Sequence, residues 1–468
     1  HSTLVAPYCS EKSLSLRVNL FLRRHTPIAS IPKRSLATSI LHTFATIVVG
    51  QGAQIAAGIA TARAFGPAGK GIISYAAVFV MFAVAGVEGL RNAIAFQFGN
   101  EGRPLGRVWH TALRILAVLA PVGSFAFLAL WLHDRSQLAF LFVAIAFPFA
   151  AYLQTVNIVY LVRGAVERLN TQNASTVGAG SAVVIFIAVV GFHANIIVVL
   201  SIWAAGHVAA ALWATVGLPG LLRAAENAPD ATAATERLWP EQARFALKGG
   251  ASAAVTLIAL RIDIIIVGSM LAKNSLGIYT TALAVAELLT ALSRSVTWAT
   301  TGRISTAPRA AAVALTAKVI RLLLAGQALA ATVVFLVGPA AIHVFYGPRF
   351  DGAGLLLRIV LARTVVYSVD GVVSYFISVR AGRPGTQFAF ELGTLVLCAV
   401  STSLAVGRFG LVGAAVAATA TFLIAFAVKL SYFTHVAGVR PRDVLLPQLD
   451  DVPPAVRLRL ARVRPVAR

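Results

Sequence analysis

The chain is poor in cysteine, methionine and acidic residues. Its 468 residues include two Cys, two Met and 17 Asp and Glu, and charged residues of either sign make up 12% of the total. Two cysteines allow at most one disulfide. Because we expect Cys9 in a cytoplasmic tail and Cys398 inside a membrane, the sequence predicts neither a disulfide nor a metal site.

Common enzyme signatures are also missing from the sequence. It contains no glycine-rich phosphate loop, no HExxH helix, no CxxC pair and no serine-centred elbow following a strand. The sequence therefore predicts a protein that is not an enzyme and that needs no cofactor.

Long apolar runs dominate what is present. Hydrophobic residues make up 58% of the chain and its mean hydropathy is +0.81, values far outside those of soluble domains. A hydrocarbon core about 30 Å thick requires roughly 20 apolar residues of helix, because only helices and closed barrels satisfy their own backbone in lipid. The sequence predicts an all-α integral membrane protein with twelve spans, the fifth of them short: 36–62, 71–97, 108–132, 138–162, 176–192, 196–222, 246–270, 277–297, 317–342, 353–378, 387–406 and 410–433.

The basic residues alternate between the connections of these spans. Of the 40 Lys and Arg, 31 fall in the two tails and the even-numbered connections with their adjoining helix ends, and six fall in the odd-numbered connections. Cytoplasmic loops carry the excess of Lys and Arg in membrane proteins. The bias places both termini in the cytoplasm, so the net charge of +23 does not call for nucleic acid as a partner. We expect the basic tails to meet anionic lipid headgroups.

The spans divide into two groups of six. The connection from Arg223 to Lys248 is rich in Ala, Pro and Glu and separates them. We expect a basic N-terminal tail without a cleavable apolar run, two six-helix lobes, a cytoplasmic linker and a basic C-terminal tail. The boundaries are 1–35 for the first tail, 36–222 for the N-terminal lobe, 223–245 for the linker, 246–434 for the C-terminal lobe and 435–468 for the second tail.

A weak internal repeat relates the two groups. Residues 65–76 read FGPAGKGIISYA after the first span, and residues 271–282 read LAKNSLGIYTTA after the seventh. Alignment of Gly71 with Gly277 also superposes Ile72 on Ile278 and Ala76 on Ala282, although Ile73 stands opposite Tyr279. Two parallel halves related by an axis along the membrane normal are typical of transporters.

Four short motifs resemble those of polysaccharide and lipid-linked oligosaccharide flippases of the multidrug/oligosaccharidyl-lipid/polysaccharide exporter superfamily. The stretch 62–71, ARAFGPAGKG, resembles the hairpin after that family's first helix. In the second half, Arg261-Ile262-Asp263 followed by the GIY of residues 277–279 resembles the family's stretch from its seventh helix into the next hairpin. Residues 89–94, GLRNAI, and 345–347, FYG, resemble its helix 2 ending and its helix 9 to 10 turn. The likeness covers 36–435, and its motifs are degenerate.

The resemblance implies an inner-membrane flippase of surface polysaccharide biosynthesis. Such a protein moves a polyprenyl pyrophosphate-linked oligosaccharide outward by alternating access. It would work beside a polysaccharide polymerase and glycosyltransferases, with membrane lipids as its surroundings. Two alternatives stay open: an ion-coupled drug or cation exporter of the same superfamily, and a membrane polymerase or glycosyltransferase, which the short outer loops disfavour.

Charged residues inside the spans are the first candidates for a site. Inserting one such side chain at mid-membrane costs about 2.5–3.5 kcal/mol of free energy, so it is expected to face the interior of the bundle or a water-filled cavity. Arg261 and Asp263 are two apart on one helix and cannot pair with each other. Arg261 could bind phosphate or brace another helix. Arg363 and Asp370 are seven apart and share a face with Tyr367, which predicts either a cavity lining or an interhelical brace.

The remaining candidates are a carboxylate, an ion pair and two amides. Glu287 is expected as a lone carboxylate near the bilayer centre, where together with Asp263 it is a candidate for ion coupling, or as a neutral brace between helices. Arg91 lies three residues after Glu88, so the two could pair, or Arg91 could meet incoming pyrophosphate. Gln51 and Gln54 could bridge helices or contact sugar hydroxyls.

The charge bias generates a topology prediction. Reporter fusions after Arg168 and after Arg383 should report the cytoplasm, and fusions near Arg135 and Phe350 should report the opposite side. Two or more inverted results would contradict the twelve-span arrangement.

Overall fold

The computed structural model describes residues 36–448 apart from 100–102, 164, 227–237, 447 and a few positions between 291 and 307. Its described elements are helices: α2 (Leu36–Gly99), α3 (Leu105–His133), α4 (Leu138–Val162), α5 (Val166–Asn173), η1 (Ala174–Gly178), α6 (Ala179–Phe192), α7 (Ile196–Glu226), α8 (Leu238–Met270), α9 (Lys273–Glu287), α11 (Arg309–Tyr346), η2 (Pro348–Phe350), α12 (Gly352–Tyr375), η3 (Phe376–Arg380), α13 (Pro384–Ala437) and α14 (Pro441–Leu445). The predicted all-α membrane fold is confirmed.

The helices account for twelve crossings once their breaks are considered. Eight helical stretches of the described residues are long and apolar enough to span a membrane. Two of them are each a pair of helices, because α2 breaks at Gly66 (φ 65°) and α13 breaks at Gly410 (φ 59°). Positive φ is accessible to glycine without steric cost. We assign the other two crossings to α8 and to α9, the second of which has 15 residues.

The fifth span is longer than the sequence suggested. It begins in the polar helix α5 and continues through the π-helical turn η1 into the apolar α6. The expected range 176–192 misses the first ten residues because the segment VERLNTQN carries no apolar run. Both expected tails lie outside the described residues, except for 435–446 and Gln448, as do residues 227–237 of the linker.

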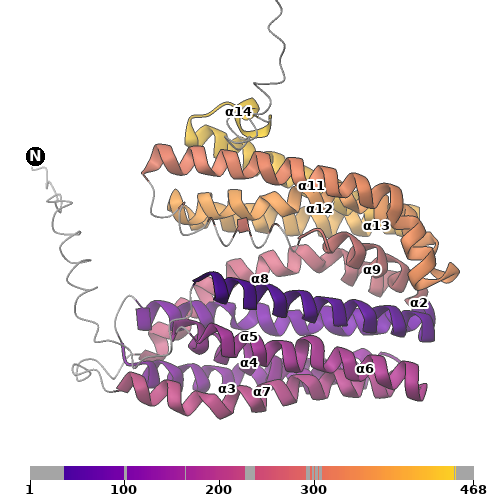
Figure 1. The fold of residues 1–468 in the computed structure, drawn as a ribbon, viewed down its shortest axis with the longest axis horizontal. Helices are drawn as coiled ribbons and strands as arrows, with labels where there is room; N and C mark the ends of the chain where they lie inside the picture. The colour runs from indigo at the N-terminus through magenta and orange to yellow at the C-terminus, as the bar shows by residue number, and fades with distance from the viewer. Residues whose placement is uncertain are drawn as a thin grey trace, which may run out of the picture.

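The helices gather into two groups that lie side by side (Figure 1). Helices α2–α7 form one group and α8–α14 the other, and we call these the N lobe and the C lobe. Their long axes are roughly parallel. The turns at Gly66 and Leu271 lie at one end of the bundle, which we call the hairpin end. The starts of α2 and α8 lie at the opposite end, which we call the linker end.

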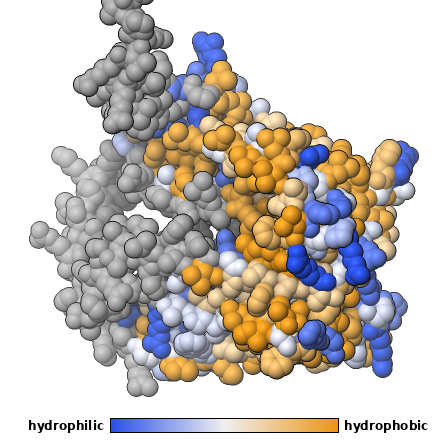
Figure 2. Space-filling view, turned by 45° about the vertical axis from the view of Figure 1, so that its right-hand side comes forward, coloured by the Kyte–Doolittle hydropathy of each residue, from blue (hydrophilic) through white to orange (hydrophobic). Residues whose placement is uncertain are grey.

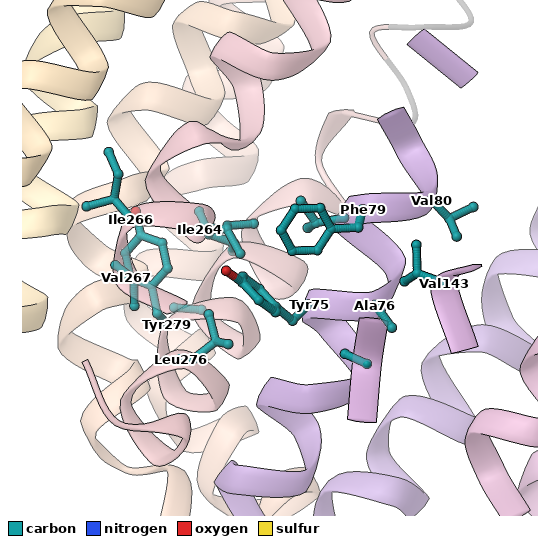
Figure 3. Packing of buried hydrophobic residues seen from close by; sticks show 14 of the residues in the cluster. Tyr75, Ala76, Phe79, Val80, Val143, Ile264, Ile266, Val267, Leu276 and Tyr279 are labelled. Carbon is teal, nitrogen blue, oxygen red and sulfur yellow. The ribbon is translucent and has the colours of Figure 1, made fainter. Parts of the chain in front are cut away.

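The lobes share a hydrophobic core toward the hairpin end. Tyr75 and Phe79 of α2 point toward Ile264 and Val267 of α8 and toward Tyr279 of α9 (Figure 3). Toward the linker end each lobe instead has its own core. One core joins α2, α3, α4, α5 and α7, with Leu90 and Trp109 among its members, and the other joins α11–α14, with Ile320 and Phe376. The lobes are therefore closed together at the hairpin end.

Glycines bring the two backbones into direct contact at this closure. A Cβ on Gly71 would lie 2.5 Å from the carbonyl oxygen of Lys273, and a Cβ on Gly277 would overlap the carbonyl oxygen of Pro67. Pro67 and Lys273 stand four residues before Gly71 and Gly277, so the two contacts are reciprocal. The repeated hairpins therefore meet across a local two-fold axis.

Two basic side chains from these hairpins also reach across to the other lobe. Arg63 donates from Nε to the carbonyl oxygen of Phe345 at 2.8 Å and from Nη2 to that of Val344. These carbonyls end α11, where the helix dipole is negative and favours a cation. Lys273 donates from Nζ to the carbonyl oxygen of Ser136 at 3.1 Å. Hydrogen bonds from Ser136 lower the pKa of Asp134 in the same loop.

The outside of the bundle is apolar, as a lipid-facing surface must be. Figure 2 shows hydrophobic side chains over much of the visible face, with hydrophilic ones gathered toward the hairpin end. Exposed large side chains include Leu329, Leu336, Phe125 and Val216. The exposed apolar residues of α3, α7 and α11 belong to lipid contact.

Gly277→Ala should open the hairpin end, because the new methyl group would meet backbone that cannot move aside. Spin labels on Arg135→Cys and Asn274→Cys, in a background without Cys9 and Cys398, should report a distance that is longer by a few ångströms. Gly326→Ala in α11 is the control, since nothing lies within 4 Å of its Cβ. An unchanged distance distribution in Gly277→Ala would contradict the backbone contact.

Candidate transport site

The charged residues of the membrane spans form ion pairs, most of them in the C lobe. The residues in question are Arg261, Asp263, Glu287, Arg363, Asp370, Glu391 and Lys429, with Glu88 and Arg91 in the N lobe. An unpaired charge buried in a medium of low dielectric constant is costly, and pairing reduces that cost.

Asp263 and Arg363 form the most deeply buried pair. Arg363 donates from Nη1 to Oδ2 of Asp263 at 2.5 Å and from Nη2 to the carbonyl oxygen of Leu260 at 3.0 Å. Tyr279 donates its hydroxyl to the same carboxylate oxygen at 2.7 Å. The Arg363 guanidinium also lies over the Phe422 ring, 4.5 Å from its centroid. This cluster joins α8, α9, α12 and α13, so these two residues brace helices in this conformation.

Arg261 and Glu287 form a second pair, which connects α8 with α9. The guanidinium and the carboxylate meet through two hydrogen bonds, one of them from Nη2 to Oε2 at 3.0 Å. The side chains are 13% and 31% exposed. Glu287 is therefore not the lone carboxylate that the sequence suggested.

Lys429, Asp370 and Glu391 form a third cluster that sequence analysis missed in part. Nζ of Lys429 donates to Asp370 at 2.9 Å and to Glu391 at 2.7 Å. Gln387 donates to Glu391 at 2.6 Å and to the Ser374 hydroxyl at 2.8 Å, and this hydroxyl donates to Asp370 at 3.2 Å. The Lys429 ammonium thus forms ion pairs with two carboxylates, one on α12 and one on α13.

Lys429 is one of the 31 basic residues that the charge bias assigned to the cytoplasmic side, and Glu391 was not among the predicted site residues. Both side chains are buried, with 4% and 7% exposure. The revised count of basic residues on the expected cytoplasmic side is 30 against six, which leaves the bias unchanged. The spacing from Glu391 back to Gln387, four residues on one helix face, was the available signal for a polar site.

A small cavity adjoins the Lys429 cluster. Its volume is about 20 Å³, which is room for roughly one water molecule. Tyr367 and Asp370 both line it, so the predicted stripe on α12 does reach a cavity, while Arg363 on the same face does not. The other walls come from α8 and α13: Thr256, Ala259, Thr394, Phe422, Ala425 and Phe426.

The N-lobe candidates are arranged differently. Arg91 pairs with Glu88 on α2 at 2.5 Å, as one of the two sequence alternatives expected. Gln51 and Gln54 are exposed, so their amides do not bridge packed helices here. Elsewhere, Arg358 is exposed and its guanidinium lies over the Phe335 ring, 5.1 Å from the ring centroid.

Lys429→Met should destabilise the C lobe strongly, because it would leave two carboxylates buried without a cation. The loss in unfolding free energy should be roughly 3–5 kcal/mol, and Lys429→Met combined with Asp370→Asn and Glu391→Gln should recover most of it. Thermal unfolding in detergent measures both. Arg408→Met, at an exposed position, is the control and should change little. Equal melting temperatures for Lys429→Met and wild type would contradict the cluster.

No family model and no curated protein sequence matches the chain, but solved structures share its fold. A multidrug resistance MATE family transporter of the MOP superfamily, in its inward-facing conformation, has a TM-score of 0.65 at 14% identity, covering 85% of this chain and 98% of that one. The lipid II flippase MurJ, inward closed, has a TM-score of 0.65 at 12% identity, covering 87% and 89%.

The outward-facing conformation of a MATE family transporter has a lower TM-score, 0.61 at 14% identity, covering 86% and 95%. At such identities the likeness concerns the fold and leaves the cargo undecided. The chain has the all-helical fold of the transporters of the MOP superfamily.

Proposed function

We propose that the protein moves a polyprenyl pyrophosphate-linked oligosaccharide from the cytoplasmic to the outer leaflet of a bacterial inner membrane by alternating access. Its fold, which a lipid II flippase and multidrug transporters share, supports movement across the membrane. The four short motifs support the flippase branch. Surface polysaccharide assembly is the process that such a cargo would serve.

The closed hairpin end supports the first step of that cycle. The lobes share one core there and have separate cores toward the linker end, so an opening between them would face the linker end. The even-numbered connections adjoin the linker end, where the described Arg107, Arg168 and Arg383 lie, and the charge bias assigns this side to the cytoplasm. An anionic lipid carrier would meet this positive charge before entering.

The observation that carries the proposal is the pairing of the carboxylates. A hydrophobic cation needs an acid that is free to receive it. In the part of the spans that the structure describes, Glu88, Asp263 and Glu287 are each bound to an arginine. A phosphate, in contrast, can compete with a carboxylate for a guanidinium, since both accept the same pair of parallel hydrogen bonds.

Arg261 is the arginine best placed for this exchange. It lies seven residues, or about two turns, before Gly268 on α8 and therefore on the same face of the helix. A Cβ on Gly268 would lie 2.5 Å from Cε2 of Tyr75, so this face is turned toward the N lobe. Arg261 would release Glu287 and take the pyrophosphate. Arg363, enclosed by Asp263 and Phe422, would keep the helices in place.

One observation favours a cation exporter as the second candidate. The Lys429 cluster holds two carboxylates for one ammonium beside a cavity, so its formal charge is negative. With Lys429 and Glu391 included, and without the helix ends counted with the connections, the C-lobe spans carry four basic and four acidic side chains, and formal charge alone does not separate the two functions.

Arg261→Ala should weaken binding of polyprenyl pyrophosphate to the purified protein in lipid nanodiscs by roughly ten- to a hundredfold, because it removes a charge-assisted contact. Arg261→Lys should recover part of the affinity, since it keeps the charge without the two parallel donors. Arg358→Ala is the matched control and should bind like wild type. Binding of ethidium by wild type, with no response to the pyrophosphate lipid, would favour the exporter instead.

A further inference from the structure

The N lobe presents polar side chains without charge at the depth where the C lobe presents its ion pair. Gln51 and Gln54 are exposed on α2, although residues from Ala57 to Ala62 on the same helix are largely buried. An exposed amide facing lipid would lose its hydrogen bonds to water without replacement. These two side chains are therefore expected to face a polar space.

The local two-fold axis shows where that space lies. Gly268 stands nine residues before Gly277 and meets Tyr75 of the other lobe. Ala62 stands nine residues before Gly71, so it is the equivalent position on the N lobe and faces the C lobe. It is fully buried within the shared core. Gln51 precedes Ala62 by eleven residues, or about three turns, and thus lies on the same face.

The depths of the two sets of side chains agree. Gln54 and Gln51 lie eleven and fourteen residues before the end of the first half of α2 at Phe65, which places them about 16 and 21 Å from the hairpin end. Arg261 lies nine residues before the end of α8, or about 14 Å, and Glu287 lies fourteen residues into α9, or about 21 Å. The amides and the ion pair therefore face one space between the lobes, near the middle of the membrane.

The two faces offer different chemistry. The positions on α2 that match Arg261 and Asp263 in the repeat are Ile55 and Ala57, so the N lobe has no counterpart to the ion pairs of α8. An amide both donates and accepts hydrogen bonds, which suits hydroxyl groups and does not favour a charge of either sign. Arg261 in the C-lobe pair suits an anion once it releases Glu287.

We propose that Gln51 and Gln54 form a subsite for the uncharged sugar hydroxyls of the cargo, opposite Arg261, which takes its pyrophosphate. The inference rests on the proposed function and adds a division of labour between the lobes. The N lobe selects for the presence of a glycan, and the C lobe selects for the anionic linkage. A carrier lipid without sugar would satisfy only one of the two faces.

Binding of two lipids to the purified full-length protein in nanodiscs tests this division. The probes are polyprenyl pyrophosphate without sugar and the lipid-linked oligosaccharides extracted from the source cells. Wild type should bind the glycosylated lipids more tightly. The variant Gln51→Leu with Gln54→Leu should lose that preference, roughly tenfold, while its affinity for the sugar-free lipid stays unchanged. Gln137→Leu in the α3–α4 loop is the matched control and should retain the preference.

The outcomes separate the two proposals. If the double variant keeps the preference, or if wild type binds both lipids equally, the sugar subsite is overturned while the proposed function stands. If wild type binds neither lipid, the proposed function fails and the subsite fails with it. The variant Gln51→Asn with Gln54→Asn keeps both amides and should retain part of the preference. This result would show that the loss in the leucine variant comes from the missing amides and not from misfolding.

Discussion

The contact between two backbones at the hairpin end is the constraint on which the arrangement of the lobes depends. Gly71 and Gly277 allow a helix of each lobe to approach the turn of the other without a side chain between them. Tyr75 then fits against Gly268, and the shared apolar core follows from that approach. Because the contact is reciprocal, the same relative position of the lobes brings both glycines against the backbone of the other lobe.

Burial of charge is the second constraint, and it acts mainly on the C lobe. The Asp263–Arg363 pair joins four helices, and Lys429 ties α12 to both halves of the broken helix α13. Removing either partner of such a pair leaves an uncompensated charge in the membrane interior. The C lobe is therefore held together by ion pairs as well as by apolar packing, whereas the N lobe relies mostly on packing.

The sequence predicted the fold well because its signals are local. Apolar length identifies a span, and Gly71 aligned with Gly277 identified the repeat that forms the contact between the lobes. The prediction failed where the structure depends on contacts between distant residues. The polar start of the fifth span looks like a loop, and Lys429 looks like the first residue of a basic tail. Nothing in the spacing of Arg261 and Glu287 reveals that they meet, since 26 residues and a turn separate them.

The candidate site was predicted as a set of residues but not as a set of contacts. Arg363 and Asp370 do share a face of α12, yet each pairs with a different helix, and only Asp370 lines a cavity. Tyr279 was noticed as a mismatch in the repeat, and the structure gives the mismatch a reason, because its hydroxyl binds Asp263. Side-chain pairing across the lobe depends on helix rotation, which one sequence does not determine.

Internal prolines are more frequent in the described helices of the N lobe than in those of the C lobe. In the N lobe, α3, α4 and α7 each contain one, at Pro121, Pro148 and Pro219, whereas the C lobe has Pro339 in α11. The described part of each lobe also contains one π-helical turn, η1 in the N lobe and η3 in the C lobe. Internal proline removes a backbone hydrogen bond and bends a helix. The N lobe therefore has more points at which its helices can bend, while ion pairs tie the helices of the C lobe to one another. Two halves of similar topology thus resist bending by different means.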